Sequence, residues 1–182
     1  HVTAMWRRCD RSCNLFESVA AGKGLDLVCR VDPSIPQELV GDSARLLQIL
    51  NNIVGNAIKY TEHGGVTVDA SALDSATSGG IRVLISVTDT GIGIRESEVN
   101  DIFEPFTQAS RGITRRYEGA GLGLSISRKL IQLMGGVLSV TSEEGAGSTF
   151  HLSIPFGLVE DAWTEARDEA LKTVGKTKKT GT

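Results

Sequence analysis

The stretch Q-I-L-N-N-I-V-G-N-A-I-K-Y-T, residues 48–61, is the most informative part of the sequence. Its apolar residues recur at helical spacing, which predicts one buried face of a long helix running from just after Asp42, a favourable N-cap residue, to about Tyr60. Asn52 and Asn56 lie four positions apart, so both amides would lie on one helix face. An amide oxygen is a suitable ligand for Mg²⁺, but a polar helix edge explains the pair equally well.

Outward from this helix, the chain alternates between two kinds of apolar pattern. Helical spacing predicts helices over residues 4–21, 96–103 and 122–134. Alternating apolar residues predict strands over 25–31, 66–73, 81–88, 137–142 and 148–155. The order predicts an α/β fold, a two-layer α/β sandwich with a mixed β-sheet and helices on one face. We expect a leading helix over residues 1–22, one domain over 23–156, and a linker with a helical pattern over 157–182.

The composition is that of a single globular domain. Hydrophobic residues make up 40% of the 182 residues and charged residues 23%, which is enough apolar material for a core. The net charge of −3 argues against a nucleic-acid partner. The odd cysteine count, Cys9, Cys13 and Cys29, predicts reduced thiols rather than a disulfide framework or a zinc site. No apolar run reaches the roughly 18 residues of a membrane span, so we expect a cytoplasmic domain.

A second motif, D-T-G-I-G-I at residues 89–94, follows a predicted strand. A carboxylate there can accept a hydrogen bond from the exocyclic amine of adenine, whereas the carbonyl of guanine would be repelled. Gly91 and Gly93 would let the backbone come close to a bound base. An ordinary turn between a strand and a helix shows the same pattern, so this motif is weak on its own.

A third motif, G-A-G-L-G-L at residues 119–124, opens a predicted helix. Backbone N–H groups at a helix N-terminus can bind phosphate, although a glycine-rich helix start for close packing remains open. A Rossmann motif does not fit, because a loop with three arginines precedes it rather than a strand, and no Gly-Lys-Ser/Thr follows as in a Walker loop. The glycine-rich residues 144–150 are expected to form chiefly a tight turn between strands.

In order and spacing, these motifs resemble the catalytic and ATP-binding domain of sensor histidine kinases. That domain has the Bergerat ATP-binding fold, shared with DNA gyrase B, MutL and the ninety-kilodalton heat-shock chaperones. The resemblance runs from about Phe16 to Phe156 and includes I-F-E-P-F at residues 102–106. It implies a domain that binds ATP and Mg²⁺ and donates the γ-phosphoryl group to a histidine.

The resemblance also implies roles for single residues. Asn56 would coordinate Mg²⁺, and Asp89 would hold the adenine amine. Asn52, Lys59 and Arg115 would act at the phosphates during catalysis. The other ATP-binding positions would be Tyr60, Gly91, Gly93, Ile94, Phe106, Gly119, Ala120, Gly121, Leu122, Gly123, Leu124 and Thr149. Two positions in or beside the third motif depart from the family pattern: Ala120 replaces a common threonine, and Glu118 stands where glycine is common.

Asn52 distinguishes between two kinds of ATP user. ATP-hydrolysing relatives have a glutamate there as general base, and an amide cannot take a proton at neutral pH, which favours phosphotransfer. None of His1, His63 and His151 is followed by Glu or Asp, as the acceptor histidine of the family is. The resemblance therefore implies a separate phosphoacceptor hairpin, followed here by the helix of residues 1–22.

The resemblance implies several partners for the full-length protein. They are its own dimerisation and phosphoacceptor domain within a homodimer, and the receiver domain of a response regulator. The composition beyond Phe156 suggests a further module, as in a hybrid kinase, and the full-length protein is either free or membrane-anchored. Two alternatives remain: a degenerate ATP-binding module that signals by contacts alone, and a serine kinase of the anti-sigma type with the same fold.

Overall fold

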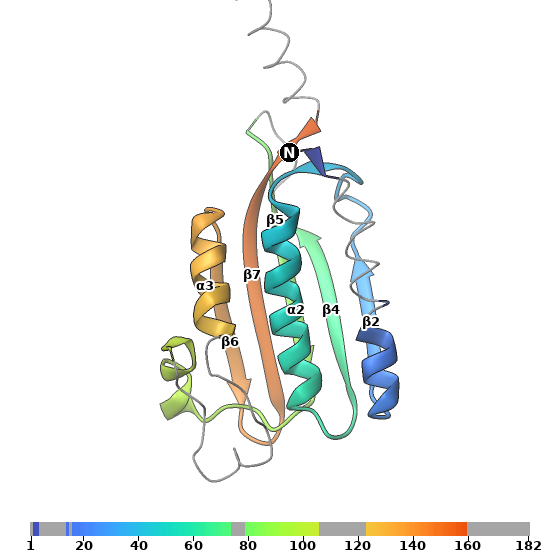
Figure 1. Cartoon of the computed structure of the whole chain (residues 1–182), viewed down its shortest axis with the longest axis vertical. Coiled ribbons are helices and arrows are strands. Elements are labelled where there is room, and N and C mark those ends of the chain that lie inside the picture. Colours follow the sequence, from blue (N-terminus) through green and yellow to red (C-terminus); the bar gives the residue numbers. More distant parts are fainter. Residues whose placement is uncertain (1, 4–13, 15, 74–78, 106–122, 160–182) are drawn as a thin grey trace, which may run out of the picture.

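The computed structural model describes residues 2–3, 14, 16–73, 79–105 and 123–159. Helices α2 (Ser43–Lys59) and α3 (Gly123–Leu133) lie side by side on one face of a β-sheet, and residues 16–22 form a further helical segment beside the lower end of α2 (Figure 1). This arrangement confirms the predicted two-layer α/β sandwich. The helix expected over residues 4–21 is described only at residue 14 and from residue 16 onward, and the expected linker is described only at residues 157–159.

The sheet is mixed, as predicted. Its seven strands are β1 (Val2–Thr3), β2 (Asp26–Val31), β3 (Leu39–Val40), β4 (Gly65–Ala72), β5 (Ile81–Asp89), β6 (Val137–Glu143) and β7 (Gly147–Leu158). The order is β1-β3-β7-β5-β4-β2, with β6 pairing along the lower part of β7. Only β2 and β4 pair in parallel among the strands described, and the other pairs are antiparallel.

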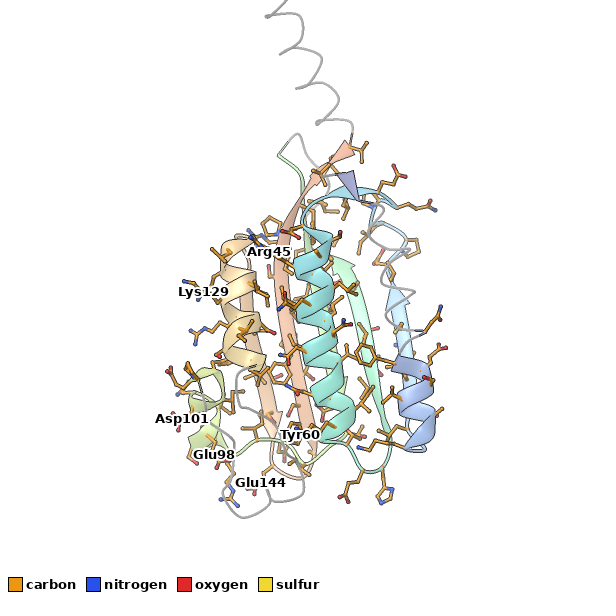
Figure 2. The ribbon with its side chains drawn as sticks, viewed as in Figure 1. Arg45, Tyr60, Glu98, Asp101, Lys129 and Glu144 are labelled. Carbon is orange, nitrogen blue, oxygen red and sulfur yellow. The ribbon has the colours of Figure 1, made fainter. Side chains whose placement is uncertain are left out.

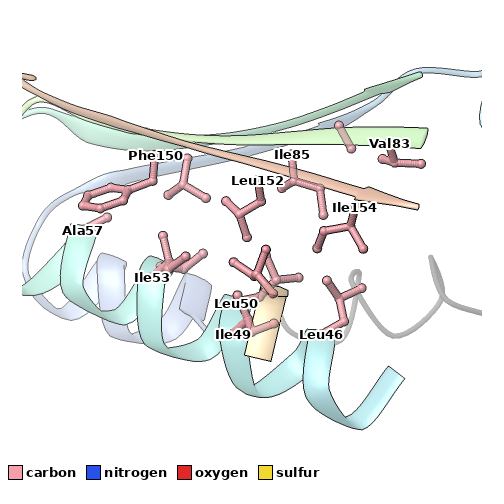
Figure 3. Packing of buried hydrophobic residues seen from close by; sticks show 14 of the residues in the cluster. Leu46, Ile49, Leu50, Ile53, Ala57, Val83, Ile85, Phe150, Leu152 and Ile154 are labelled. Atoms are coloured by element: carbon pink, nitrogen blue, oxygen red, sulfur yellow. The ribbon is translucent and has the colours of Figure 1, made fainter. Parts of the chain in front are cut away.

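The core lies between α2 and the two central strands, β5 and β7. The apolar face of α2 packs onto alternate residues of these strands (Figure 3). The labelled side chains of that contact are Leu46, Ile49, Leu50, Ile53, Ala57, Val83, Ile85, Phe150, Leu152 and Ile154. The helix begins as predicted, because the carboxylate of Asp42 accepts a hydrogen bond from the Arg45 N–H at 3.0 Å.

The other face of the sheet is polar and carries no described helix. Neighbouring strands are joined there by side-chain hydrogen bonds, between Thr88 and Thr149 at 3.1 Å and between Ser86 and the His151 ring at 3.2 Å. Along β5 and β7, residues alternate strictly between this open face and the helix-covered face. The alternation decides which side chains can reach a site beside α2.

Three expectations about this part of the chain are wrong. Residues 96–103 form two short 3₁₀ turns, Glu96–Glu98 and Asp101–Phe103, because Ile102 is the one buried residue and no apolar stripe supports an α-helix. Strand β2 is a largely exposed edge strand, whereas the alternation of apolar and polar residues over 25–31 predicts a half-buried one. Cys29 is disulfide-bonded rather than a reduced thiol, and its partner cysteine lies outside the described residues.

No helix in the described ranges combines the length and the apolar character that a membrane crossing requires.

Replacing Ile53 by alanine tests the packing of α2. Ile53 is 0% exposed, so Ile53→Ala should lower the free energy of unfolding by about 2–5 kcal/mol through lost apolar contact and the cavity left behind. Urea denaturation followed by circular dichroism measures the change. The control, Ile126→Ala, removes a side chain that is 44% exposed and should change stability by less than about 0.5 kcal/mol. Similar losses in both variants would contradict this account of the core.

Candidate nucleotide-binding site

Asp89 ends β5 at the same end of the sandwich as the C-terminus of α2. It is 7% exposed, and its Oδ1 accepts a hydrogen bond from the Gly91 N–H at 2.9 Å. Burial raises the pKa of the Asp89 carboxyl, while the backbone N–H groups of Gly91 and Ser148 act in the opposite direction. The free protein therefore buries a carboxylate that a ligand with an N–H donor would stabilise.

Gly91 lies directly against the end of α2. A Cβ at this position would collide with the Tyr60 carbonyl oxygen and would come within 3.0 Å of the Thr61 hydroxyl. The next residue fastens the loop, because the Ile92 N–H donates to the same Tyr60 carbonyl at 3.2 Å. Only glycine permits this approach, which brings the loop after β5 into contact with the end of α2.

The loop after β5 also contacts the turn between β6 and β7. Gly93 has a φ of +69°, and a Cβ there would collide with the Glu143 carbonyl oxygen. Two hydrogen bonds tie the loop to the turn, from Gly145 N–H to the Ile92 carbonyl at 2.7 Å and from Ile94 N–H to the Ser142 hydroxyl at 2.8 Å. Figure 2 shows Tyr60 and Glu144 at this end of the molecule. The turn expected to be chiefly structural thus also supports the loop.

Asn52 lies where α2 meets the start of α3. Its Nδ2 donates to the Ser127 hydroxyl at 2.9 Å, and Gly123 packs so closely on the Asn52 amide that a Cβ would collide with Oδ1. The structure therefore brings the asparagine motif and the last glycine of the third motif together. Leu124 beside it packs against the core, as Ile94 does at the other loop.

Asn56 and Lys59 follow along α2 toward its end, and both are partly exposed. The Lys59 ammonium lies 5.4 Å from the centroid of the Tyr60 ring, a cation–π distance. Burial raises the pKa of the Tyr60 hydroxyl. Asn56 and Lys59 thus lie in the C-terminal half of α2, and Tyr60 is its C-cap residue, next to the Asp89 loop.

Thr149 is not brought to this cluster. It pairs with Thr88 in the register of β5 and β7, so its side chain lies on the open face of the sheet. Ser148, one residue earlier, pairs with Asp89 on the helix-covered face and is 7% exposed. A shift of one residue along a strand moves a side chain to the opposite face, so Ser148 is the neighbour of Asp89 that we missed.

Thr61 is a second residue that sequence reasoning missed. It is fully buried, and its hydroxyl donates to the Ala57 carbonyl at 2.7 Å beside Gly91. Each missed residue has a signal in the sequence. Thr61 is the last residue of the motif at residues 48–61, and Ser148 is in phase with the buried Phe150 and Leu152. Six expected site residues lie outside the described part of the chain: Phe106, Arg115, Gly119, Ala120, Gly121 and Leu122.

Comparison with known proteins agrees with this geometry. The profile of the family described as "Histidine kinase-, DNA gyrase B-, and HSP90-like ATPase" matches residues 41–158. Hybrid signal transduction histidine kinase A of Dictyostelium discoideum is 46% identical over 76% of this chain and 7% of its own length. Signal transduction histidine-protein kinase BarA of Escherichia coli K12 is 39% identical over 82% of this chain and 16% of its own.

Solved structures show the same similarity in three dimensions. The crystal structure of full-length ShkA in complex with AMPPNP has a TM-score of 0.70 at 39% identity and covers 82% of this chain and 29% of that one. The mycobacterial sensor histidine kinase MprB has a TM-score of 0.67 at 26% identity, over 86% of this chain and 97% of that one.

The chain belongs to the family of histidine kinase-, DNA gyrase B- and HSP90-like ATPases. Within it, the chain is an ATP-binding catalytic domain of the histidine kinase type, the kind found in two-component systems. It spans 7% to 20% of the length of the curated relatives named above and of the sensory protein RpfC of Xanthomonas campestris.

Replacing Asp89 by asparagine should stabilise the domain without nucleotide at neutral pH. The folded-state pKa of Asp89 is raised, so its ionised form lowers the stability of the folded wild type. The wild type regains this lost stability as pH falls through the folded-state pKa and the carboxyl is protonated. The advantage of Asp89→Asn should therefore be largest at about pH 7, shrink on acidification, and level off below the ordinary aspartate range near about pH 3.9. Urea unfolding across this range measures it. An advantage that grows on acidification would contradict the raised pKa.

Proposed function

We propose that this domain binds Mg-ATP and donates the γ-phosphoryl group to a histidine on a separate domain. The observation that carries the proposal is the buried Asp89 carboxylate, held where Gly91 packs on the end of α2. An adenine amine would donate to that carboxylate and offset the cost of burying it. Guanine has a carbonyl at the same position, so the site would select against it.

The hydroxyl groups of Thr61 and Ser148 support an adenine site. Both are buried on the side of the sheet that carries Asp89. The Ser148 hydroxyl lies 2.8 Å from the Ser142 hydroxyl, which itself accepts from the Ile94 N–H. A chain of hydroxyls of this kind can orient a donor or a water toward a ring nitrogen of the base.

Asn56 would hold Mg²⁺. Its amide is partly exposed on α2 and makes no side-chain hydrogen bond to another described residue, so its oxygen is available to a cation that keeps most of its waters. Bound there, Mg²⁺ would neutralise charge on the β- and γ-phosphates. Lys59, one turn nearer the end of α2, would place an ammonium beside the same phosphates, and Arg115 is proposed for the γ-phosphate.

Asn52 supports phosphotransfer rather than hydrolysis. It is neutral, and its amide N–H is already donated to Ser127 on α3, so it cannot remove a proton from water. An imidazole nitrogen brought by another domain needs no such base. It would attack the γ-phosphorus in line, and the bond to the oxygen bridging the β- and γ-phosphates would break to release ADP.

The remaining assignments belong to the same proposal. The acceptor histidine would lie on a dimerisation domain of the same protein, within a homodimer, and a receiver domain would take the phosphoryl group from it. The naming of relatives as hybrid kinases supports this order of partners. We propose a cytoplasmic location because ATP is the donor, and the domain limits 1–22, 23–156 and 157–182 remain part of the hypothesis.

Two variants and one control test the adenine site. Asp89→Asn should weaken ATP binding by roughly 1–3 kcal/mol, the cost of losing a charge-assisted hydrogen bond. Ser148→Ala should weaken it by about 1 kcal/mol, whereas Thr149→Ala, on the open face, should leave it unchanged. Isothermal titration calorimetry with ATP and GTP measures these effects. Unchanged ATP affinity in Asp89→Asn would refute the adenine assignment, and no saturable binding to the wild type would favour a degenerate module.

Asn56→Ala tests the magnesium assignment. The variant should lose the gain in ATP affinity that Mg²⁺ provides and bind nearly as the wild type does in excess chelator, because only the cation ligand is removed. Titrations of both proteins with ATP, with Mg²⁺ and with chelator, give the comparison. An equal loss under both conditions would mean that Asn56 acts structurally.

A further inference from the structure

Lys23 connects the end of the helical segment at residues 16–22 to the end of α2. Its ammonium donates three hydrogen bonds to backbone carbonyls, of Ile58 at 2.7 Å, Lys59 at 3.2 Å and Thr61 at 3.0 Å. The last carbonyls of a helix have no partner within the helix and carry the negative end of its dipole, so a cation is well suited there. A residue far away in sequence thus caps the helix that carries Asn52, Asn56 and Lys59.

The backbone around Lys23 is fixed by a local motif. The Gly24 N–H donates to the Ala21 carbonyl at 3.0 Å and the Leu25 N–H to the Ala20 carbonyl at 2.9 Å, and Gly24 has a φ of +71°. This is a Schellman ending, in which Lys23 is the helix C-cap residue and Gly24 takes the left-handed position. Ala20 and Leu25 on either side are buried in the core. The lysine therefore starts from a defined point rather than from a loose loop.

The capped carbonyls border the carbonyl on which the candidate site depends. Tyr60 lies between Lys59 and Thr61, and its oxygen accepts from the Ile92 N–H and contacts Gly91. Lys23 and Ile92 together therefore engage the carbonyls of residues 58–61. If the ammonium were removed, the end of α2 would lose the donors that hold it from one side while Gly91 and Ile92 still contact it from the other.

We infer that Lys23 is a positioning residue for nucleotide binding, which fixes the end of α2 against the Asp89 loop so that the adenine pocket is preformed. In this role it would act through the backbone of α2 rather than by contact with the nucleotide. The inference rests on the proposed adenine site at Asp89. It also couples the segment at residues 16–22 to the nucleotide, because binding and docking of that segment would favour each other by the same factor.

Lys23→Met, made in the full 182-residue chain, tests this role. The change keeps the aliphatic stem and removes the donors, so dissociation constants for ATP and for adenosine should both rise about three- to tenfold, the change expected for one helix-terminal cation. The inhibition constant of tripolyphosphate should stay unchanged, because the substitution alters none of the side chains proposed for the phosphates. Competition against a fluorescent ATP analogue measures all three. Lys23→Arg should restore adenosine binding to within about twofold.

The matched control is Lys129→Met. Lys129 is exposed on α3 and points away from α2 (Figure 2), so this variant should bind ATP and adenosine as the wild type does. Thermal unfolding without nucleotide confirms that each variant is folded. If Lys23→Met is not folded, Lys23→Gln replaces it, because glutamine keeps an N–H donor without the charge.

The outcomes separate the two hypotheses. A wild type that binds ATP and a Lys23→Met variant with unchanged adenosine affinity overturn the role of Lys23 alone. A larger loss for ATP and tripolyphosphate than for adenosine also overturns it, because it would mean a direct phosphate contact. A wild type that binds no ATP refutes the proposed function itself. Equal losses for ATP and adenosine with rescue by Lys23→Arg support the inference, since lowered stability alone would not spare tripolyphosphate.

Discussion

The contact between Gly91 and the Tyr60 carbonyl is the constraint on which the rest of the site depends. It joins the sheet layer to the helix layer at one point, and a single Cβ there would force the two apart. Because the loop lies flat against α2, the carboxylate of Asp89 is enclosed instead of facing water. The contact thereby creates the unfavourable burial that the proposed adenine ligand would relieve.

That burial has opposite effects on stability and on binding. A carboxylate with a raised pKa weakens the free fold at neutral pH, whereas the same carboxylate would give the proposed adenine site its selectivity for a hydrogen-bond donor. Hydrogen bonds between the β6–β7 turn region and Ile92 and Ile94 hold the loop in place without any ligand. Backbone contacts at glycines therefore hold the loop of the proposed adenine site before any ligand binds, which would reduce the ordering cost of binding.

The sequence predicts those parts of the site that depend on local periodicity. The apolar stripe and N-cap of α2 and the position of Asp89 at the end of β5 follow from patterns of a few residues. Local patterns do not distinguish Thr149 from Ser148, because the pairing of β7 with β5 decides which of the two lies beside Asp89. The two-residue strands β1 and β3 carry no periodicity, and the hydrogen bonds of Lys23 join segments more than thirty residues apart, so neither leaves a local signal.

Asn52 shows how a structural contact can restrict chemistry. Its amide is packed against Gly123 and donates to Ser127, so one side chain sets the spacing between α2 and α3. A glutamate would be one methylene longer, and the surface left by Gly123 would have to move to admit it. It would also lose the N–H that Ser127 accepts. A glutamate in this position would therefore require α3 to dock differently, and the proposed preference for transfer over hydrolysis would follow from how α3 docks as much as from the amide itself.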